Sequence, residues 1–287
     1  FGTMSDDMAR LLSLCTAGSL TFFTVGPTAS GKTTTNNAIL QSMPATTRVI
    51  LLQNPSEIDL RFKDATGRIY NDVLHIEATE KENPTPTDAT MANSMDMTLR
   101  LSPTYVALGE VRTNMEFKQA MKIMNAGHPI NTTYHAEDSV GAISRFLSAY
   151  LAESGNEPSH LALKTLAGLV NIIIVQKILR DGTRKVIQIS EVVGINPNNE
   201  NEAIINDLYV FDIDEDPIYD ENGNLVEIRG KHKKVGEISD ALVNKLLIEG
   251  IPRSKLEFLT SSEGNDKEQT YSGNNIDDYW VGGSTNY

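Results

Sequence analysis

The feature that most constrains the fold of this chain is a glycine-rich segment at residues 26–33, which reads GPTASGKT. An apolar, strand-like run at 20–25 precedes it, and a helix-like run at 34–43 follows it. In that context the pattern G-x-x-x-x-G-K-[ST] is typical of a phosphate-binding loop, whereas the alternative is a surface turn of small polar residues. Gly26 and Gly31 let the backbone fold so tightly that its N–H groups point inward at phosphate oxygens.

The last residues of this segment each have a chemical role beside a nucleotide. The ammonium group of Lys32 reaches the terminal phosphates, and the hydroxyl of Thr33 is a ligand for Mg²⁺. The N-terminus of the following helix adds a positive dipole. The segment therefore predicts that the chain binds a nucleotide together with Mg²⁺. The predicted contacts are Gly26, Pro27, Thr28, Ala29, Ser30, Gly31, Lys32, Thr33 and Thr34.

Length and composition limit the class of protein. The chain has 287 residues, of which 40% are hydrophobic and 22% charged, and this is ordinary for a globular protein with one large core or two modest ones. No window approaches the roughly 18 apolar residues that a membrane span needs. The net charge of −13 argues against broad binding of nucleic acid, which requires a basic face.

The single cysteine, Cys15, excludes an intramolecular disulfide and a zinc site built from several cysteines. It fits a reducing, cytoplasmic setting, and the first residues carry no secretory signal. Because the chain begins with Phe1, we expect it to be a fragment or to keep a residue from a tag.

Strand-like and helix-like runs alternate over the first 150 residues. Such alternation predicts a mostly parallel sheet with helices on both faces, in which ligands bind at the carboxyl ends of the strands. The segment at 85–88 reads TPTD, which supplies the N-cap, the first-turn proline and the carboxylate of a helix start. The expected helices lie at 5–17, 34–43, 85–101, 114–126, 139–151, 160–170 and 239–249, and the expected strands at 20–25, 48–53, 73–77, 104–108, 130–134, 171–179, 184–193 and 208–213.

The later part of the chain has a different character. Asp181-Gly182 and Asn222-Gly223 are strong signals for β-hairpin turns. We therefore expect an α/β core at 1–195, followed by a small α+β extension with β-hairpins at 196–260. Residues 261–287 are rich in Ser, Gly, Asn and Asp and poor in aliphatic residues, a composition that predicts a disordered tail.

A second group of chemical residues ends the expected strand at 104–108, which continues as Gly109-Glu110-Val111-Arg112. A carboxylate at the tip of a buried strand can lie beside the phosphate loop, where it holds the Mg²⁺ shell or orients a water. Arg112 can reach the γ-phosphate or a carboxylate of a neighbouring subunit. The alternative for a lone match of this kind is an ordinary charged strand end.

His135 ends the next expected strand, at the same edge of the sheet. It is placed to sense the γ-phosphate or to form a hydrogen bond with the Glu110 carboxylate. A single histidine is more often structural, and we read His75, His160 and His232 in that way.

Taken in order, these segments resemble the secretion and pilus-assembly traffic ATPases, the hexameric motors of type II secretion, type IV pili and type IV secretion. The matching segments are the phosphate loop, GEVR at 109–112, AGH at 126–128 and TYHA at 133–136. The stretches at 181–194 and 208–211 resemble the tight-adherence pilus branch in particular.

The resemblance covers about residues 8–258 and lacks the N-terminal domain that family members carry. It implies a RecA-like P-loop NTPase fold, with ATP and Mg²⁺ as cofactors. It also implies a homo-oligomer, expected to be a hexamer, located in the cytoplasm at the inner face of the cell membrane. There it would work with an inner-membrane platform protein of a pilus or secretion machine.

The resemblance also implies roles for single residues. Lys32 and Thr33 would bind phosphate and Mg²⁺, Glu110 would be the Walker B glutamate and a metal ligand, and His135 would be the histidine of the family's histidine box. Arg100 and Arg112 match arginines that lie near the nucleotide at protomer boundaries.

One departure from the family pattern affects the chemistry. Family members carry an acidic pair after the second strand, whose first glutamate helps to activate the attacking water, but this chain has Gln53 and Asn54 there. Gln53 is isosteric with glutamate and can orient a water, although it cannot take a proton. Glu57 matches the second glutamate of that segment. The predicted catalytic residues are Glu110, Gln53, Glu57, His135, Arg112 and Arg100, and the predicted metal ligands are Thr33 and Glu110.

Three functions follow from these residues. The first is an ATP-hydrolysing motor subunit that powers pilus assembly, pilus retraction or protein secretion. The second is an ATP-binding module of ring assembly with weak or no hydrolysis, because the loss of a general base costs a factor of roughly 10² to 10⁴ in rate. The third is a nucleic-acid motor of the same phosphate-loop class, which the negative charge disfavours.

Overall fold

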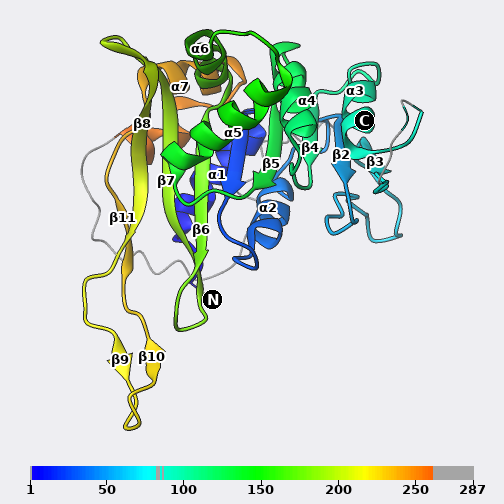
Figure 1. Ribbon diagram of the computed structural model, residues 1–287. Helices are drawn as coiled ribbons and strands as arrows, with labels where there is room; N and C mark the ends of the chain where they lie inside the picture. The colour runs from blue at the N-terminus through cyan, green and yellow to red at the C-terminus, as the bar shows by residue number, and fades with distance from the viewer. Residues whose placement is uncertain (1, 82–84, 86, 261–287) are drawn as a thin grey trace.

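The computed structural model describes residues 2–81, 85 and 87–260. Its centre is a nine-stranded sheet in the order β11-β8-β7-β6-β1-β5-β4-β2-β3 (Figure 1). The disordered tail predicted at 261–287 lies outside the described residues. The strands of this sheet are β1 Phe22–Val25, β2 Val49–Gln53, β3 Val73–Glu77, β4 Tyr105–Leu108, β5 Ile130–Tyr134, β6 Ile172–Ile178, β7 Arg184–Asn196, β8 Asn199–Asp212 and β11 Lys231–Lys234.

The sheet is parallel on one side and antiparallel on the other. The pairings that join β6, β1, β5, β4, β2 and β3 are all parallel. The strands β6, β7, β8 and β11 are joined by antiparallel pairings. The predicted mostly parallel sheet is confirmed. Because β1, β4 and β5 are parallel neighbours, the residues that follow them meet at one edge.

Helices cover both faces of the sheet, as predicted. Alternate residues of β2 show this directly, since Val49 and Leu51 join one apolar cluster while Ile50 and Leu52 join the other. The first cluster includes residues of α1 Asp6–Ala17, α2 Lys32–Leu40, α7 Asp240–Ile248 and α8 Glu257–Thr260. The second includes residues of α3 Met91–Thr98, α4 Asn114–Asn125, α5 Ser139–Glu153 and α6 Ser159–Leu169.

The helix start predicted at Thr85 is wrong. Helix α3 begins at Met91, and its N-cap is Thr90, whose hydroxyl accepts a hydrogen bond from the N–H of Asn93. Asp88 instead accepts from the backbone N–H of Thr85 at 2.6 Å and from its hydroxyl at 2.8 Å. The same residue types that cap a helix also close local turns, and Thr85 and Asp88 form such a turn instead of starting the helix. The helix ends at Thr98, before the predicted end at 101.

The two predicted hairpin turns are confirmed. The first, at Asp181-Gly182, joins β6 to β7, and the second, at Asn222-Gly223, joins β9 Ile218–Tyr219 to β10 Leu225–Glu227. The sequence prediction missed β11, and the strand predicted at 208–213 is only the end of the long strand β8. The boundary predicted at residue 195 stays a prediction. It falls within the last residues of β7, and β7 pairs with β8 in one sheet.

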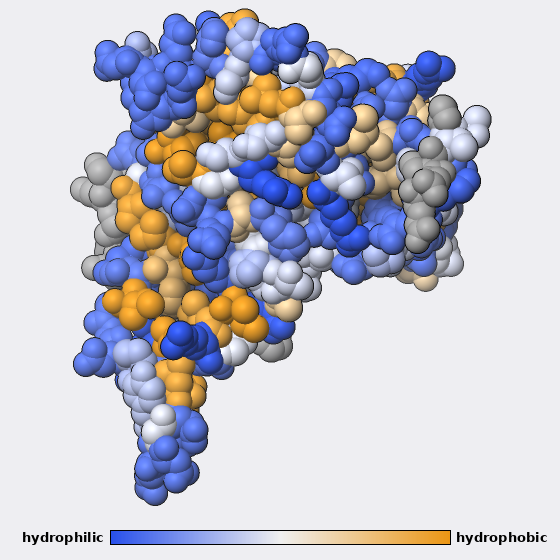
Figure 2. All heavy atoms as spheres, viewed as in Figure 1, coloured by the Kyte–Doolittle hydropathy of each residue, from blue (hydrophilic) through white to orange (hydrophobic). Residues whose placement is uncertain are grey.

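The strands β9 and β10 form a ribbon that projects from the body of the molecule (Figure 1). Figure 2 shows apolar surface along this ribbon and at its base. Ile213 and Val226 are both 55% exposed there.

Candidate functional site

The phosphate-loop segment forms the predicted turn between β1 and α2. Gly26 has a φ of +152° and Gly31 a φ of +92°, backbone angles that residues other than glycine rarely adopt. A Cβ atom on Gly26 would also lie 2.0 Å from the carbonyl oxygen of Gln176. Strand β6 therefore presses so closely against the loop that only glycine fits at its first position.

Lys32 lies inside the loop rather than in solvent. Its side chain is 7% exposed, and its Nζ donates to the carbonyl oxygens of Gly26 at 3.0 Å and Pro27 at 2.8 Å. Burial lowers the pKa of Lys32, and the negative charge of Glu110 acts in the opposite direction. An ammonium group has three protons, so one remains for a phosphate oxygen after the two carbonyl bonds are made.

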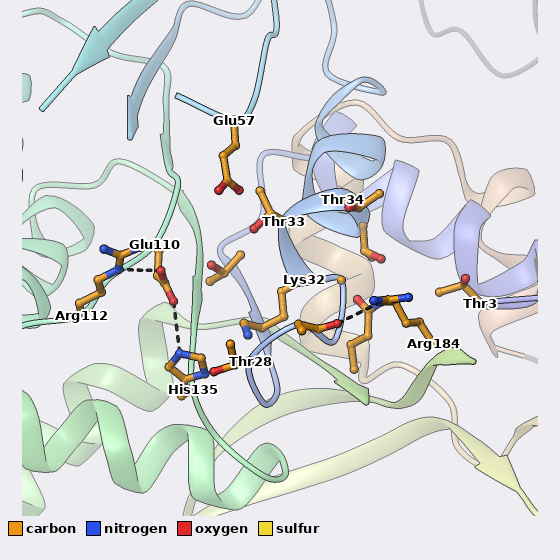
Figure 3. Close-up of a pocket in the computed structure, with 15 residues that line it drawn as sticks. Thr3, Thr28, Lys32, Thr33, Thr34, Glu57, Glu110, Arg112, His135 and Arg184 are labelled. Carbon is orange, nitrogen blue, oxygen red and sulfur yellow. Dashed lines mark hydrogen bonds and ion pairs between the residues drawn. The ribbon is translucent and has the colours of Figure 1, made fainter. Parts of the chain in front are cut away.

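Glu110, Arg112 and His135 meet beside the loop (Figure 3). The Glu110 carboxylate accepts from the Nε of Arg112 at 2.7 Å, and its other oxygen lies 3.5 Å from the Nε2 of His135. The Nδ1 of His135 lies 3.1 Å from the carbonyl oxygen of Gly26. The imidazole thus bridges the phosphate loop and the carboxylate that follows β4. The hydrogen bond from Arg112 to Glu110 raises the pKa of the arginine.

A cavity of about 850 Å³ lies between these groups. Most of the predicted site residues line it, and five further residues line it that the sequence reasoning missed. The predicted ones are Thr28, Ala29, Gly31, Lys32, Thr33, Thr34, Glu57, Glu110, Arg112 and His135, and the missed ones are Thr3, Thr35, Thr133, Gln176 and Arg184.

Gln53 is not among the residues that line the cavity. Its side chain is 1% exposed and holds the loop that follows β2. The amide oxygen accepts from the backbone N–H groups of Glu57 at 3.0 Å and Ile58 at 2.9 Å, and the amide nitrogen donates to the Ile58 carbonyl oxygen at 2.7 Å. Gln53 therefore fixes the backbone from which Glu57 reaches the cavity.

Arg100 also lies away from the cavity. It follows the end of α3, where its backbone N–H donates to the carbonyl oxygen of Met97, and its side chain is exposed. Of the other predicted residues, Gly26, Pro27 and Ser30 form the loop but do not line the cavity.

A buried amide pair ties α2 to β5. The Nδ2 of Asn36 donates to the Oδ1 of Asn131 at 2.7 Å, and the Nδ2 of Asn131 donates back to the Oδ1 of Asn36. Both residues are fully buried. On the same strand, the Thr133 hydroxyl donates to the Gly109 carbonyl oxygen at 2.9 Å. These contacts hold the loop helix, the strand of His135 and the strand end of Glu110 in one arrangement.

The donor set fits a Mg²⁺ that is bound together with phosphates. No group of three or more His, Cys, Asp and Glu side chains among the described residues forms a metal site by itself. Thr33 and Glu110 both line the cavity and offer one oxygen ligand each. Mg²⁺ usually keeps several waters and takes one or two protein ligands plus phosphate oxygens, and Thr33 and Glu110 match that small number of protein ligands. Within residues 2–81, 85 and 87–260, no helix has the length and apolar character of a membrane span.

Comparison with known proteins places the chain in a family. The type II/IV secretion system protein family matches residues 1–247. An uncharacterised protein of Methanocaldococcus jannaschii, MJ0900, is 27% identical over 196 residues, which is 68% of this chain and 32% of that protein. The type II secretion system ATPase E of Vibrio cholerae is 31% identical over 150 residues, which is 52% of this chain and 26% of that ATPase. The chain thus spans less than half the length of these relatives.

The solved structures agree on the fold. The VirB11 ATPase of the Brucella suis type IV secretion system, crystallised with sulphate, superposes with a TM-score of 0.53 at 23% identity, over 64% of this chain and 51% of that one. This likeness confirms the predicted RecA-like fold. The tight-adherence branch stays a prediction, whereas the superfamily is confirmed by the match to residues 1–247. The chain belongs to the type II/IV secretion system protein family.

Proposed function

We propose that this chain binds ATP with Mg²⁺ and hydrolyses it as the motor subunit of a machine for pilus dynamics or protein secretion. One observation carries the proposal: Lys32, Glu110 and His135 line the same cavity at the tip of a glycine loop. The loop N–H groups and Lys32 would bind the phosphates, and Thr33 and Glu110 would hold the metal. Bound Mg²⁺ would neutralise charge on the phosphates during transfer to water.

Two carboxylates line the cavity, Glu110 and Glu57. Glu110 is held by Arg112 and His135, which suits a fixed metal ligand. Glu57 is therefore the better candidate for orienting the attacking water and taking its proton. Gln53 would act through Glu57, as a positioning residue, because its amide is occupied by the loop after β2 and by His75 of β3.

The test is steady-state ATP hydrolysis by the wild type and by three single variants, Glu57→Gln, Glu110→Gln and Glu137→Gln. Glu137 is an exposed carboxylate two residues after His135 and outside the cavity, so its variant is the matched control. We expect kcat to fall by roughly 10² to 10⁴ in the Glu57 variant with little change in ATP affinity. Equal rates for the Glu57 and Glu137 variants would contradict the role of Glu57.

The weak-hydrolysis module is the second candidate, favoured by the glutamine at position 53. Turnover per folded molecule of the wild type and of Gln53→Glu separates the two functions. If the glutamate variant is at least tenfold faster, the wild type is the weak module. If the wild type hydrolyses ATP on the order of once per second or faster and the variant is no faster, the result supports the motor function.

The partners and the location belong to the same proposal. We propose a homo-hexamer at the cytoplasmic face of the membrane, docked on a platform protein. Arg100 is exposed and outside the cavity of its own chain, so it would reach the nucleotide only of a neighbouring copy. Light scattering with and without ATP·Mg²⁺ tests the ring, and a single monomeric species under both conditions would contradict it.

A further inference from the structure

Besides Lys32 and Arg112, the cavity is lined by a third cationic side chain, which lies at the end opposite Glu110. Arg184, from the start of β7, lines it together with Thr3 and Thr34. In Figure 3 these three residues lie on one side of Lys32, while Glu110 and His135 lie on the other. Lys32 and Arg184 therefore both lie beside the path that a polyphosphate would take across the loop.

Arg184 is fixed against the phosphate loop. Its Nε donates to the carbonyl oxygen of Ala29 at 3.0 Å. Its Cδ lies 3.0 Å from the place where a Cβ on Gly31 would be, so the arginine stem packs on the loop itself. One hydrogen bond and this contact orient the guanidinium plane, and they leave the two terminal nitrogens for another acceptor.

Within the described part of the chain, no acidic side chain forms an ion pair with this arginine. The ion pairs of the described residues do not include Arg184, and no described residue accepts a hydrogen bond from its terminal nitrogens. A guanidinium with two free, parallel donors matches the oxygens of a phosphate group. Because this arginine lies at the edge of the loop that we propose to bind phosphates, its unpaired donors favour an anionic ligand.

The direction of the ligand follows from the opposite end of the cavity. The terminal phosphate belongs beside Glu110 and Thr33, where the metal ligands lie, so the phosphate nearest the nucleoside lies toward Arg184. We propose that Arg184 is a phosphate-binding residue of the site, which donates from its terminal nitrogens to the α-phosphate of the nucleotide. This inference rests on the proposed nucleotide binding.

The test uses Arg184→Gln and, as its matched control, Arg180→Gln. Arg180 is an exposed arginine in the same hairpin turn and does not line the cavity, so its variant removes the same charge from the same segment. Calorimetric titration measures the affinity of both variants and of the wild type for ATP·Mg²⁺ and for tripolyphosphate·Mg²⁺, which lacks the nucleoside. An Arg184→Lys variant keeps the charge but loses the paired donors.

We expect Arg184→Gln to bind ATP and tripolyphosphate roughly tenfold to a hundredfold more weakly than the wild type, with an intermediate loss in Arg184→Lys. Arg180→Gln should bind within twofold of the wild type. In hydrolysis, KM should rise and kcat at saturating ATP should stay within about threefold, because Arg184 does not touch the terminal phosphate. Unchanged thermal unfolding temperatures would show that the variants are folded.

Three results would overturn the assignment. Equal losses in the Arg184 and Arg180 variants would mean a general charge effect. A loss for ATP but not for tripolyphosphate would place the contact on the nucleoside. A loss of kcat with no change in KM would place it at the terminal phosphate. If the folded wild type binds neither ligand, the proposed nucleotide site itself fails, and that outcome is distinct from the other three.

Discussion

Replacing Gln53 with glutamate tests whether the loop after β2 depends on an amide. The Nε2 of Gln53 donates to the carbonyl oxygen of Ile58 at 2.7 Å, and its Oε1 accepts from the backbone N–H groups of Glu57 and Ile58. An ionised carboxylate keeps the two accepted bonds. Its second oxygen, however, would face the Ile58 carbonyl oxygen, and neither atom carries a proton, so that carbonyl oxygen loses its donor. The Nε2 of His75 and the hydroxyl of Ser56, which lie 2.6 Å and 3.2 Å from the Gln53 Nε2, can still donate to the new oxygen.

The magnitude follows from what is lost. The buried carbonyl oxygen of Ile58 then has no donor, and a buried acceptor without a donor costs about 1–3 kcal/mol. We therefore expect the free energy of unfolding to fall by about 1–3 kcal/mol at pH 8. The protonated carboxyl can donate as the amide does, so the folded state raises the pKa of the introduced group above its ordinary value of about 4.3. The deficit is absent below that pH and grows as pH rises toward the folded-state pKa.

The assay is urea unfolding at pH 5 and pH 8 of the wild type, Gln53→Glu and Gln41→Glu. Gln41 also donates to a backbone carbonyl, that of Asp59, but it is exposed, so its variant controls for the added charge. At pH 5 the deficit of Gln53→Glu should be no more than about 1 kcal/mol. A Gln53→Glu variant as stable as Gln41→Glu at both pH values would refute the reasoning.

Three further outcomes follow from other parts of the fold. The buried carboxylate of Glu191 accepts hydrogen bonds from the backbone N–H and the hydroxyl of Ser239 at the start of α7. Glu191→Ala should therefore lower the free energy of unfolding, measured by urea titration, by about 2–3 kcal/mol. A loss below about 0.5 kcal/mol would contradict this. Cys15 is fully buried, and burial raises the pKa of its thiol to about 12, so a thiol reagent should label it only as fast as the protein unfolds; rapid labelling under native conditions would contradict its placement. Burial lowers the pKa of His232 below 6.5, so the unfolded state binds the proton more readily. The contribution of His232 to stability is then fully present above pH 6.5 and is lost as the pH falls below that value. Between pH 8 and pH 5, the thermal unfolding temperature of His232→Gln should fall less than that of the wild type. Parallel curves for the two proteins would exclude this contribution.

The parts of the site that could be predicted from the sequence share one property: a local pattern specifies them. The phosphate loop needs glycine at two positions and lysine at a third, and the strand before it and the helix after it are both visible in the sequence. Glu110 and His135 each come just after a short strand, and parallel strands bring such ends together.

Arg184 and Thr3 could not be predicted because tertiary contacts place them. Arg184 reaches the loop through a contact between residues 155 positions apart. Thr3 is held by its backbone carbonyl oxygen, which accepts a hydrogen bond from the backbone N–H of Val186, a residue far away in the sequence. No local pattern marks either residue.

The secondary-structure errors have the same origin. Strand β8 begins with NENE, a polar run with low strand preference, and this run belongs to the strand because β8 pairs with β7. Strand β11 reads KHKK, and it extends the sheet edge through pairing with β8. At α3, the prediction took Thr85 as the N-cap, but Thr85 forms a local turn with Asp88 and the helix is capped by Thr90 instead.

The central claim is that the glycine loop of this chain binds the phosphates of a nucleotide through Lys32. Calorimetric titration of ATP·Mg²⁺ into the wild type, Lys32→Ala and Lys63→Ala tests it most directly, since Lys63 is exposed and outside the cavity. We predict saturable binding by the wild type and the Lys63 variant, and affinity at least about a hundredfold lower in the Lys32 variant. Equal affinity in all three folded proteins, or no binding by the folded wild type, would contradict the account.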